Sequence, residues 1–255
     1  MRINDCVAIV TGGSSGLGEA TVRSLVGKGA KAFILDIDEE KGRRLESELG
    51  GSVGFHYTDV TSEKDVEAAM MNAIDSFGCI NTVVNCAGIA PPSKVSGRKG
   101  VHSLDLFSKV IEINLIGTFN IIRLAAQNMQ GNEKNECGER GLIINTASVA
   151  AFDGQIGQAA YSASKAGVAG MTLPIARELA RDGIRVMTIA PGLFQTPMFD
   201  SLPEEARTSL GENVPFPKRL GYPSEFAQLV DAIIENPMLN GETIRLDGAI
   251  RMQPK

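Results

Sequence analysis

The sequence predicts an α/β fold built on a parallel, doubly wound sheet. Short apolar runs rich in β-branched residues alternate with helical patterns along all 255 residues. Right-handed crossovers turn that order into a parallel sheet with helices packed against it. The chain has no linker, composition shift or internal repeat. We therefore expect one domain over residues 1–255, with a cofactor half of about 1–150 and a catalytic and substrate half of about 140–255.

Composition and charge exclude several classes of protein. With 43% hydrophobic and 22% charged residues the chain can bury a large core. No apolar run approaches the roughly 18 residues that a membrane span needs, so we expect no membrane partner. The net charge of −5 argues against direct binding of nucleic acid.

Cysteine and histidine usage predicts neither a metal site nor a disulfide framework. The four cysteines form no Cys-x-x-Cys pair, and the two histidines stand alone. This usage fits a reducing compartment. The N-terminal residues have no apolar signal region and no Arg-rich presequence. We expect a cytoplasmic location, with the mitochondrial matrix as the alternative.

The first strand, turn and helix follow a dinucleotide-binding pattern. An apolar strand over 7–11 leads into a glycine-rich turn, and a helical pattern then runs to residue 28. Glycines let the backbone approach a pyrophosphate at the helix N-terminus, where free N–H groups favour negative charge. A simple tight turn is the alternative. The candidate cofactor residues of the turn are Gly12, Ser14, Ser15, Gly16, Leu17 and Gly18.

Asp36 ends the second predicted strand, residues 31–36. A carboxylate at this position can accept hydrogen bonds from both ribose hydroxyls of NAD, and it would repel the 2′-phosphate of NADP. The alternative is a carboxylate that caps a turn. A helix over 39–49 follows.

The middle of the chain continues the alternation. A strand over 53–57 leads to Asp59, and a capping-box pattern at 62–65 begins a helix with an apolar stripe to residue 77. A fourth strand, 82–86, breaks into a glycine.

Residues 90–102 predict a loop with a basic cluster of Lys94, Arg98, Lys99 and His102, and a helix from Ser103 to about residue 129 follows. Asn114 lies near the middle of that helix, where an asparagine costs helix propensity and invites a functional reason.

Ser148, Tyr161 and Lys165 are the strongest candidates for chemistry. Ser148 follows a strand over 142–147, at the edge where open α/β sheets hold ligands. Tyr161 and Lys165 lie one turn apart near the start of a long helix. Ionising a phenol at pH 7 requires roughly 4 kcal/mol of preferential stabilisation, which a lysine and a positively charged nicotinamide can supply. Because Tyr-x-x-x-Lys also occurs by chance, the rest of the chain has to support this interpretation.

The last third contains two more strands, over 185–190 and 243–246, and a helix from Pro223. Between them we expect an irregular segment that ends at Leu220. Its apolar residues indicate either a lid over a hydrophobic substrate or packing on the body of the domain. These residues are Phe194, Met198, Phe199, Leu202, Leu210 and Phe216.

These motifs together resemble those of the short-chain dehydrogenases/reductases over nearly the whole chain. The resemblance rests on Thr11-Gly-x-x-x-Gly16-x-Gly18, Asp59, Asn85-Cys-Ala-Gly88, Asn114, Ser148, Tyr161-x-x-x-Lys165 and Pro191-Gly192. It implies a Rossmann-like, seven-stranded sheet and a nicotinamide cofactor, and Asp36 favours NAD.

The resemblance also implies roles for single residues. Tyr161 would be the general acid/base, Ser148 would orient the substrate oxygen, and Lys165 would lower the pKa of the phenol and hold the nicotinamide ribose. Asn114 would support a proton relay, and Asp59 would contact the adenine. Further cofactor-binding positions are Val60, Asn85, which would stabilise the sheet, Ala87, Gly88, Pro191, Gly192, Phe194 and Thr196, which would bind the carboxamide.

Longer segments are similar to a narrower group, the type-2 3-hydroxyacyl-CoA dehydrogenases, also called 17β-hydroxysteroid dehydrogenases type 10. They span 144–152, 157–165, 170–177, 186–194 and 244–252. This similarity implies reversible, NAD-dependent oxidation of an acyl-CoA thioester, with hydroxysteroids as further candidates. It implies a homotetramer and substrate contacts from Ser148, Gln155 and Tyr161. A different 90–102 loop and a shorter N-terminus than in mitochondrial animal members leave substrate choice and compartment open.

Two alternatives compete with this prediction. An NADPH-dependent 3-oxoacyl-carrier-protein reductase would share the same catalytic residues, but Asp36 beside Ser14 and Ser15 argues against NADPH. A non-catalytic scaffold subunit is the second alternative, because animal relatives also serve in a tRNA-processing complex. The intact Ser148, Tyr161 and Lys165 favour catalysis.

Overall fold

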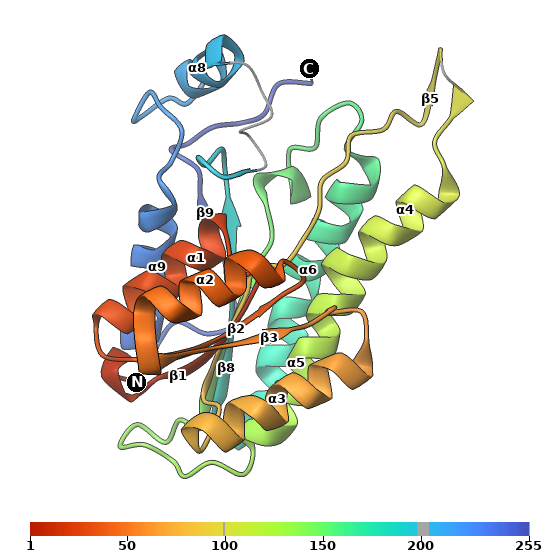
Figure 1. Ribbon diagram of the computed structural model, residues 1–255. Coiled ribbons are helices and arrows are strands. Elements are labelled where there is room, and N and C mark those ends of the chain that lie inside the picture. The colour runs from red at the N-terminus through yellow and green to blue at the C-terminus, as the bar shows by residue number, and fades with distance from the viewer. Residues whose placement is uncertain (99, 198–203, 255) are drawn as a thin grey trace.

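A parallel seven-stranded sheet runs through the described part of the chain in the order β3-β2-β1-β4-β7-β8-β9 (Figure 1). This computed structural model describes residues 1–98, 100–197 and 204–254. The strands of the sheet are β1 (Val7–Thr11), β2 (Lys31–Asp36), β3 (Val53–Tyr57), β4 (Thr82–Asn85), β7 (Gly141–Thr146), β8 (Ile184–Pro191) and β9 (Thr243–Leu246). The predicted fold class is confirmed, and the predicted strand ends are shifted by no more than one residue.

Helices cover both faces of the sheet, because successive strand side chains point to opposite faces and nearly all are apolar. In β1, Ala8 and Val10 belong to one buried cluster and Ile9 to the other. The first cluster is covered by α1 (Gly16–Gly27), α2 (Glu39–Leu49) and α9 (Pro223–Glu235). The second is covered by α3 (Glu63–Phe77), α5 (Thr118–Met129) and α6 (Ala159–Leu179).

The helix predicted over 103–129 is interrupted in its middle. Ser103 caps α4 (Leu104–Ile111), as expected, by accepting a hydrogen bond from the backbone of Leu106. A π-helical segment, Glu112–Gly117, then joins α4 to α5. Such segments are rare and recur at functional sites. Asn114 lies inside this one.

The loop prediction for 90–102 is partly wrong. Two short antiparallel strands, β5 (Ser96–Gly97) and β6 (Gly100–Val101), pair there and project from the body beside α4 (Figure 1). Gly100 permits the turn with its φ of 111°. Of the predicted basic cluster, Lys94 and Arg98 are exposed, and Lys99 lies outside the described residues.

The segment after β8 is also more ordered than predicted. It contains a helix, α8 (Glu204–Glu212), and its two ends are tied together. Gln195 N donates to Gly221 O at 2.8 Å, and Gly221 N donates to Leu193 O at 2.8 Å. Met198, Phe199 and Leu202 of the predicted lid lie outside the described residues. Phe194 is buried in the core, which agrees with packing on the body of the domain, whereas Phe216 is 82% exposed. A lid over a hydrophobic substrate stays a prediction.

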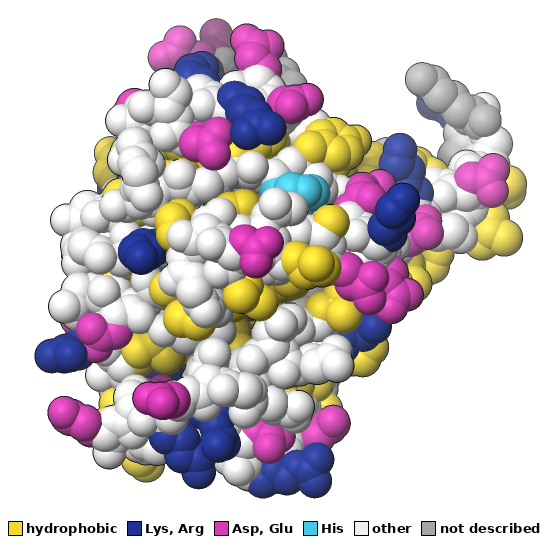
Figure 2. Space-filling view, turned by 60° about the horizontal axis from the view of Figure 1, so that its bottom comes forward, with side chains coloured by type: hydrophobic (Ala, Val, Ile, Leu, Met, Phe, Trp, Pro, Cys, Tyr) yellow, Lys and Arg dark blue, Asp and Glu magenta, His cyan; other side chains and the backbone are white. Residues whose placement is uncertain are grey.

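The remaining helical elements are short 3-10 turns at Ile3–Asp5, Gly50–Ser52, Val149–Ala151 and Ala180–Asp182. None of the helices within the described ranges is long and apolar enough to cross a membrane. On the face seen in Figure 2, basic and acidic side chains are interspersed.

The sheet order places a crevice beside β1. The chain leaves β1 toward β2 and β3 and later returns to β4 on the other side of β1. Connections that diverge in this way open a crevice at the carboxyl ends of the strands, where ligands of such sheets bind. The turns after β1 and β4 meet there, since a Cβ on Gly12 would lie only 2.9 Å from Ala87 N.

Candidate active site

The glycine-rich turn after β1 leaves no space for a side chain at Gly12 or Gly18. Gly12 and Gly16 have φ values of 60° and 54°, which strain other L-residues. A Cβ on Gly18 would overlap the carbonyl group of Gly12. The backbone can therefore come close to a ligand at the N-terminus of α1, as predicted for this turn. Ser14, Ser15 and Leu17 lie in the same turn and the first turn of α1.

Asp36 lies beside this turn, at the carboxyl end of β2. Its Oδ2 accepts hydrogen bonds from the backbone N, at 3.1 Å, and from the hydroxyl of Ser14. Its Oδ1 accepts from Asp38 N at 3.1 Å. These bonds fix a half-buried carboxylate next to the glycine-rich turn.

Asp59 and Val60 follow β3, the next strand beyond Asp36. The Oδ1 atom of Asp59 accepts from the backbone N and hydroxyl of Thr61 at 2.9 and 2.8 Å. Val60 is buried, and its carbonyl accepts from Asn120 of α5 at 3.0 Å. Both predicted positions thus lie at the same edge of the sheet as Asp36.

Buried polar side chains link the ends of β1, β4 and β7. Asn85 donates to Asn145 Oδ1 at 2.9 Å. The hydroxyl of Thr11 accepts from the backbone N atoms of Cys86 and Ala87 at 3.1 and 3.2 Å. These bonds hold the turn that leads to Gly88, in line with the sheet-stabilising role expected for Asn85. Thr11 entered the prediction only as part of a motif, and its position at a strand end before a glycine was the available signal.

Asn114 is fully buried and holds the segment after Gly88. It accepts from Ile89 N and donates to Ile89 O, both at 2.8 Å. It also donates to Ser164 Oγ at 3.1 Å, and that hydroxyl donates to Tyr161 O at 2.7 Å. Asn114 thus connects the π-helical segment to both the β4 turn and α6. The prediction missed Ser164, although its position three residues after Tyr161 places it on the same side of the helix.

Ser148, Tyr161 and Lys165 come together as predicted. Ser148 follows β7, and its hydroxyl accepts from Ala150 N at 3.1 Å and lies close enough to the Tyr161 phenol to influence its pKa. Lys165 Nζ lies 5.8 Å from the centroid of the Tyr161 ring and donates to Thr146 O at 2.7 Å. A Cβ on Gly88 would lie 3.1 Å from Asn114 Oδ1 and 3.6 Å from Lys165 Nζ. All four predicted catalytic side chains therefore lie close together, near the carboxyl ends of β4 and β7.

Burial opposes the charged forms of both titrating side chains. It raises the pKa of the Tyr161 phenol, and the nearby Ser148 hydroxyl acts in the opposite direction. It lowers the pKa of Lys165 to about 8, so the ammonium still predominates at pH 7. In the free protein burial is thus the largest influence on the pKa of the Tyr161 phenol, and the lowering expected from Lys165 together with a bound nicotinamide stays a prediction.

The remaining predicted residues lie on the other side of the crevice. Pro191 ends β8, and Gly192 N donates to Leu246 O at 2.9 Å. The side chain of Thr196 lies 3.4 Å from the place of a Cβ on Gly16, so it faces the glycine-rich turn.

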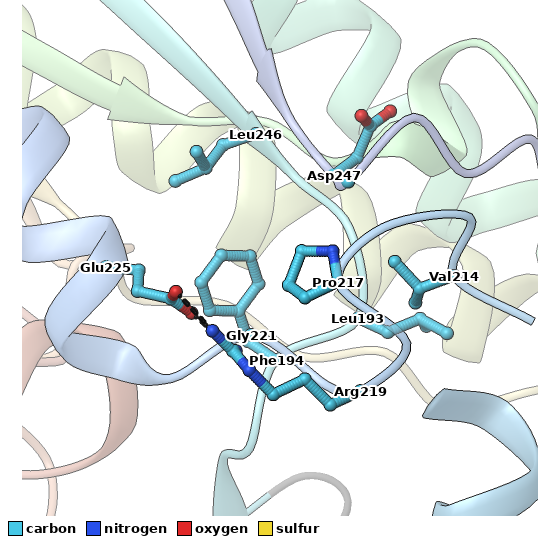
Figure 3. Close-up of a pocket in the computed structure, with 10 residues that line it drawn as sticks. Leu193, Phe194, Val214, Pro217, Arg219, Gly221, Glu225, Leu246 and Asp247 are labelled. Carbon is cyan, nitrogen blue, oxygen red and sulfur yellow. Dashed lines mark hydrogen bonds and ion pairs between the residues drawn. The ribbon is translucent and has the colours of Figure 1, made fainter. Parts of the chain in front are cut away.

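Phe194 and Gln155 are engaged within the protein. The ring of Phe194 packs over Gly221 and lines a small pocket with Val214 and Pro217, next to the Arg219–Glu225 ion pair (Figure 3). Gln155 donates through its Nε2 to Gln253 O at 3.0 Å. Within the described ranges no three acidic, histidine or cysteine side chains gather as metal ligands do, and all four cysteines are free.

A comparison with protein families agrees with this geometry. Residues 6–207 match the model of a family described as short chain dehydrogenase. The chain belongs to the short-chain dehydrogenase family. This short-chain dehydrogenase is 59% identical to the human 3-hydroxyacyl-CoA dehydrogenase type-2 over 99% of its length and 97% of the relative. The Drosophila melanogaster protein of the same name is 58% identical over 99% of this chain and 100% of the relative.

Solved structures and other relatives extend the comparison. The crystal structure of a 3-hydroxyacyl-CoA dehydrogenase type-2 from Mycobacterium avium is 46% identical, with a TM-score of 0.93 over 97% of this short-chain dehydrogenase and 96% of that chain. A 3-oxoacyl-[acyl-carrier-protein] reductase from Thermotoga maritima is 34% identical over 98% of this chain and 99% of the relative. The predicted family is thereby confirmed.

Proposed function

We propose that this short-chain dehydrogenase oxidises a 3-hydroxyacyl-CoA to the 3-oxoacyl-CoA, reversibly and with NAD. The observation that carries the substrate is the 58–59% identity to 3-hydroxyacyl-CoA dehydrogenases type-2 over 99% of the chain. The grouping of Ser148, Tyr161 and Lys165 supports the chemistry. Hydroxysteroids are further candidate substrates.

The crevice fits a nicotinamide dinucleotide. The glycine-rich turn offers backbone N–H groups and a helix N-terminus for the pyrophosphate. Asp36 would hold the adenosine ribose, and Asp59 and Val60 the adenine. Lys165, Asn85, Ala87, Gly88, Pro191, Gly192, Phe194 and Thr196 would surround the nicotinamide end. When bound, the nicotinamide supplies the hydride acceptor.

In this mechanism Tyr161 moves the proton. Its phenolate would accept the proton of the substrate 3-hydroxyl as the C=O bond forms, and the hydride of the same carbon would go to the acceptor that a bound nicotinamide supplies. Ser148 holds the substrate oxygen by a hydrogen bond. Lys165 would stabilise the phenolate, which burial alone disfavours, and a bound nicotinamide would supply further positive charge. Asn114 holds the segment after the β4 turn and Ser164 of α6 by hydrogen bonds, and it would support the exit of the proton.

The two ends of the thioester substrate would lie in different surroundings. The apolar residues of the segment between 194 and 220 would cover the acyl chain, where each buried methylene contributes about 0.8 kcal/mol. The exposed Lys94 and Arg98 would meet the negative CoA. Gln155 would contact the substrate from the loop between Ser148 and Tyr161.

The alternatives have less support. A 3-oxoacyl-carrier-protein reductase remains the second candidate because of the 34% identical Thermotoga maritima relative. Fatty acid metabolism, a homotetramer, and a cytoplasmic or mitochondrial matrix location complete the proposal. The tetramer is supported by the small side chains on α6, and the compartment by the free cysteines.

Reduction of acetoacetyl-CoA with NADH and with NADPH, measured side by side, tests the proposal. We expect turnover with a clear preference for NADH. Equal or better turnover with NADPH would favour the reductase. Activity on other secondary alcohols but none on acyl-CoA thioesters would refute the substrate.

Replacing Asp36 with Ala tests the cofactor preference at its source. The change removes the like charge that would face a 2′-phosphate, so the ratio of kcat/KM for NADH to that for NADPH should decrease. We expect this decrease to come mainly from a lower KM for NADPH. An unchanged ratio would mean that another group selects the cofactor.

A further inference from the structure

The loop that joins Ser148 to Tyr161 is held from outside by the end of the chain. This substrate loop, defined here as residues 153–157, carries Gln155. Ile156 N donates to Pro254 O at 3.0 Å, next to the bond from Gln155 Nε2 to Gln253 O. On its other side, Gly157 O accepts from Ser93 N at 2.8 Å. The loop is therefore fixed between Ser93, in the segment after β4, and Gln253 and Pro254, in the C-terminal segment that follows β9.

Arg245 of β9 connects the loop to the C-terminal segment. Its Nη2 donates to Asp153 Oδ2 at 2.6 Å and to Ile250 O at 3.1 Å. Its Nε donates to Asp247 Oδ2 at 2.7 Å, and its guanidinium lies 5.3 Å from the centroid of the Phe152 ring. One planar cation thus binds the substrate loop, the turn after β9 and the segment beyond it.

The ion pair between Arg245 and Asp153 is largely shielded from solvent. The side chains of Arg245 and Asp153 are 21% and 20% exposed, and the guanidinium holds the pKa of Asp153 below its usual value. A lysine could not replace this arrangement, because its single ammonium lacks the planar fork that reaches both carboxylates and a carbonyl.

The turn after β9 also contacts two other parts of the site. A Cβ on Gly192 would lie 2.9 Å from both the Cα and the Cβ of Asp247. Phe216 N donates to Gly248 O at 3.3 Å. The C-terminal segment and α8 lie along the same edge of the molecule in Figure 1. Through the bond to Gly248 O, the turn after β9, which Arg245 joins to the substrate loop, is also joined to Phe216, one of the apolar residues expected to cover the acyl chain.

We propose that Arg245 is a positioning residue that sets the acyl-chain side of the substrate site, by fixing the 153–157 loop to the C-terminal segment through Asp153 and Ile250 O. Arg245 acts through the loop and touches neither Tyr161 nor Lys165 in the described structure. The inference rests on the proposed function, since it assigns the acyl end of that substrate.

The test compares Arg245→Lys and Asp153→Asn with wild type on acetoacetyl-CoA and 3-oxooctanoyl-CoA, with NADH. Both variants should raise KM for the longer thioester by about tenfold, the effect of about 1.4 kcal/mol. KM for acetoacetyl-CoA should change by less than about threefold, which is less than 1 kcal/mol. The kcat with acetoacetyl-CoA and the Kd of NADH should stay near those of wild type.

Arg251→Gln is the matched control. Arg251 is also an arginine bonded to Asp247 Oδ2, at 3.2 Å, and it donates to Ile250 O at 2.8 Å, but no hydrogen bond joins it to Asp153 in the described residues. The comparison therefore isolates the bond from Arg245 to Asp153. This variant should retain the wild-type chain-length profile. Thermal unfolding and light scattering of all variants separate positioning from general damage.

The outcomes distinguish this inference from the proposed function. If wild type fails on both thioesters, the proposed function is wrong. If wild type is active but both variants keep its chain-length profile, Arg245 has no positioning role. Equal losses on both thioesters, together with weaker NADH binding, a lower Tm or a changed oligomeric mass, would also overturn the inference.

Discussion

At the scale of single residues, the surroundings of the site disfavour the charged side chains on which its chemistry depends. The phenol of Tyr161 and the ammonium of Lys165 are both withdrawn from water, and burial disfavours the charged form of each. The free protein therefore holds Tyr161 as a neutral proton donor. The phenolate needed for oxidation has to be stabilised by the cationic nicotinamide together with Lys165.

Tyr161→Phe tests the proton transfer directly. The variant keeps the aromatic ring and removes the donor, so kcat should fall by about 10²–10⁴-fold. Binding of NADH, followed by titration calorimetry, should remain close to wild type. Retention of most of the activity would mean that another group moves the proton.

Lys165→Met tests how much burial of the Lys165 ammonium reduces the stability of the folded protein. The shift of its pKa from 10.5 to about 8 corresponds to a cost of about 3 kcal/mol at pH 7. The lost hydrogen bond to Thr146 O offsets only about 1 kcal/mol of the gain. The inactive variant should thus be more stable than wild type at pH 7.

The sign of the pH dependence makes this prediction specific. The folded-state pKa is the lower one, so the cost is present in full below pH 8 and disappears as pH rises through 10.5. The stability advantage of Lys165→Met, measured by urea unfolding, should therefore shrink between pH 7 and pH 10. The same advantage at both pH values would contradict this explanation.

At the scale of elements, the sequence predicts regular helices and strands better than features that depend on contacts with distant parts of the chain. The strands and long helices were predictable because the spacing of apolar residues and the presence of capping residues, such as Ser62, are local features of the sequence. The π-helical turn at Asn114 was not, since it depends on bonds to Ile89 and Ser164 from other elements. The same holds for Phe194, which packs against Gly221 far along the chain, and for the contacts of Gln155 with the C-terminal segment.

Asn114→Ala tests the link between the π-helical segment and the site. It leaves the N–H and C=O of Ile89 without their partners, at a cost of about 1–3 kcal/mol, which exceeds the small helix-propensity gain of alanine. The Tm should fall, and kcat should fall with it because the turn beside Lys165 loosens.

Asn120→Ala is the matched control for this change. Asn120 is a second buried asparagine of the same helical stretch. It donates to Val60 O and accepts from Arg123, and within the described residues no hydrogen bond joins it to Ile89 or Ser164. Its loss should reduce the Tm to a similar extent and change kcat much less. Equal losses of kcat in both variants would reduce Asn114 to a structural role.

At the scale of the whole molecule, one side of α6 is suited to contact with another copy of the chain. Ala163, Ala166 and Gly170 are exposed on this helix, whose other side carries Lys165. Together with the more shielded Gly167 and Ala169, they leave a shallow surface that another close-packed element can approach. The same face borders a hollow that is lined by Phe152 and by Thr243, the latter on the edge strand β9.

Gly170→Gln tests the proposed homotetramer through this surface. A Cβ on Gly170 meets no atom within 4 Å, so the substitution is tolerated in a single chain but would obstruct a close neighbour. Gly27→Gln is the control, because Gly27 is also an exposed helical glycine with nothing within 4 Å of its Cβ position, on α1. Light scattering at micromolar concentration should give a four-chain mass for wild type and for Gly27→Gln, and a smaller mass for Gly170→Gln. A single-chain mass for wild type would refute the tetramer, and a four-chain mass for Gly170→Gln would place its interfaces elsewhere than on this side of α6.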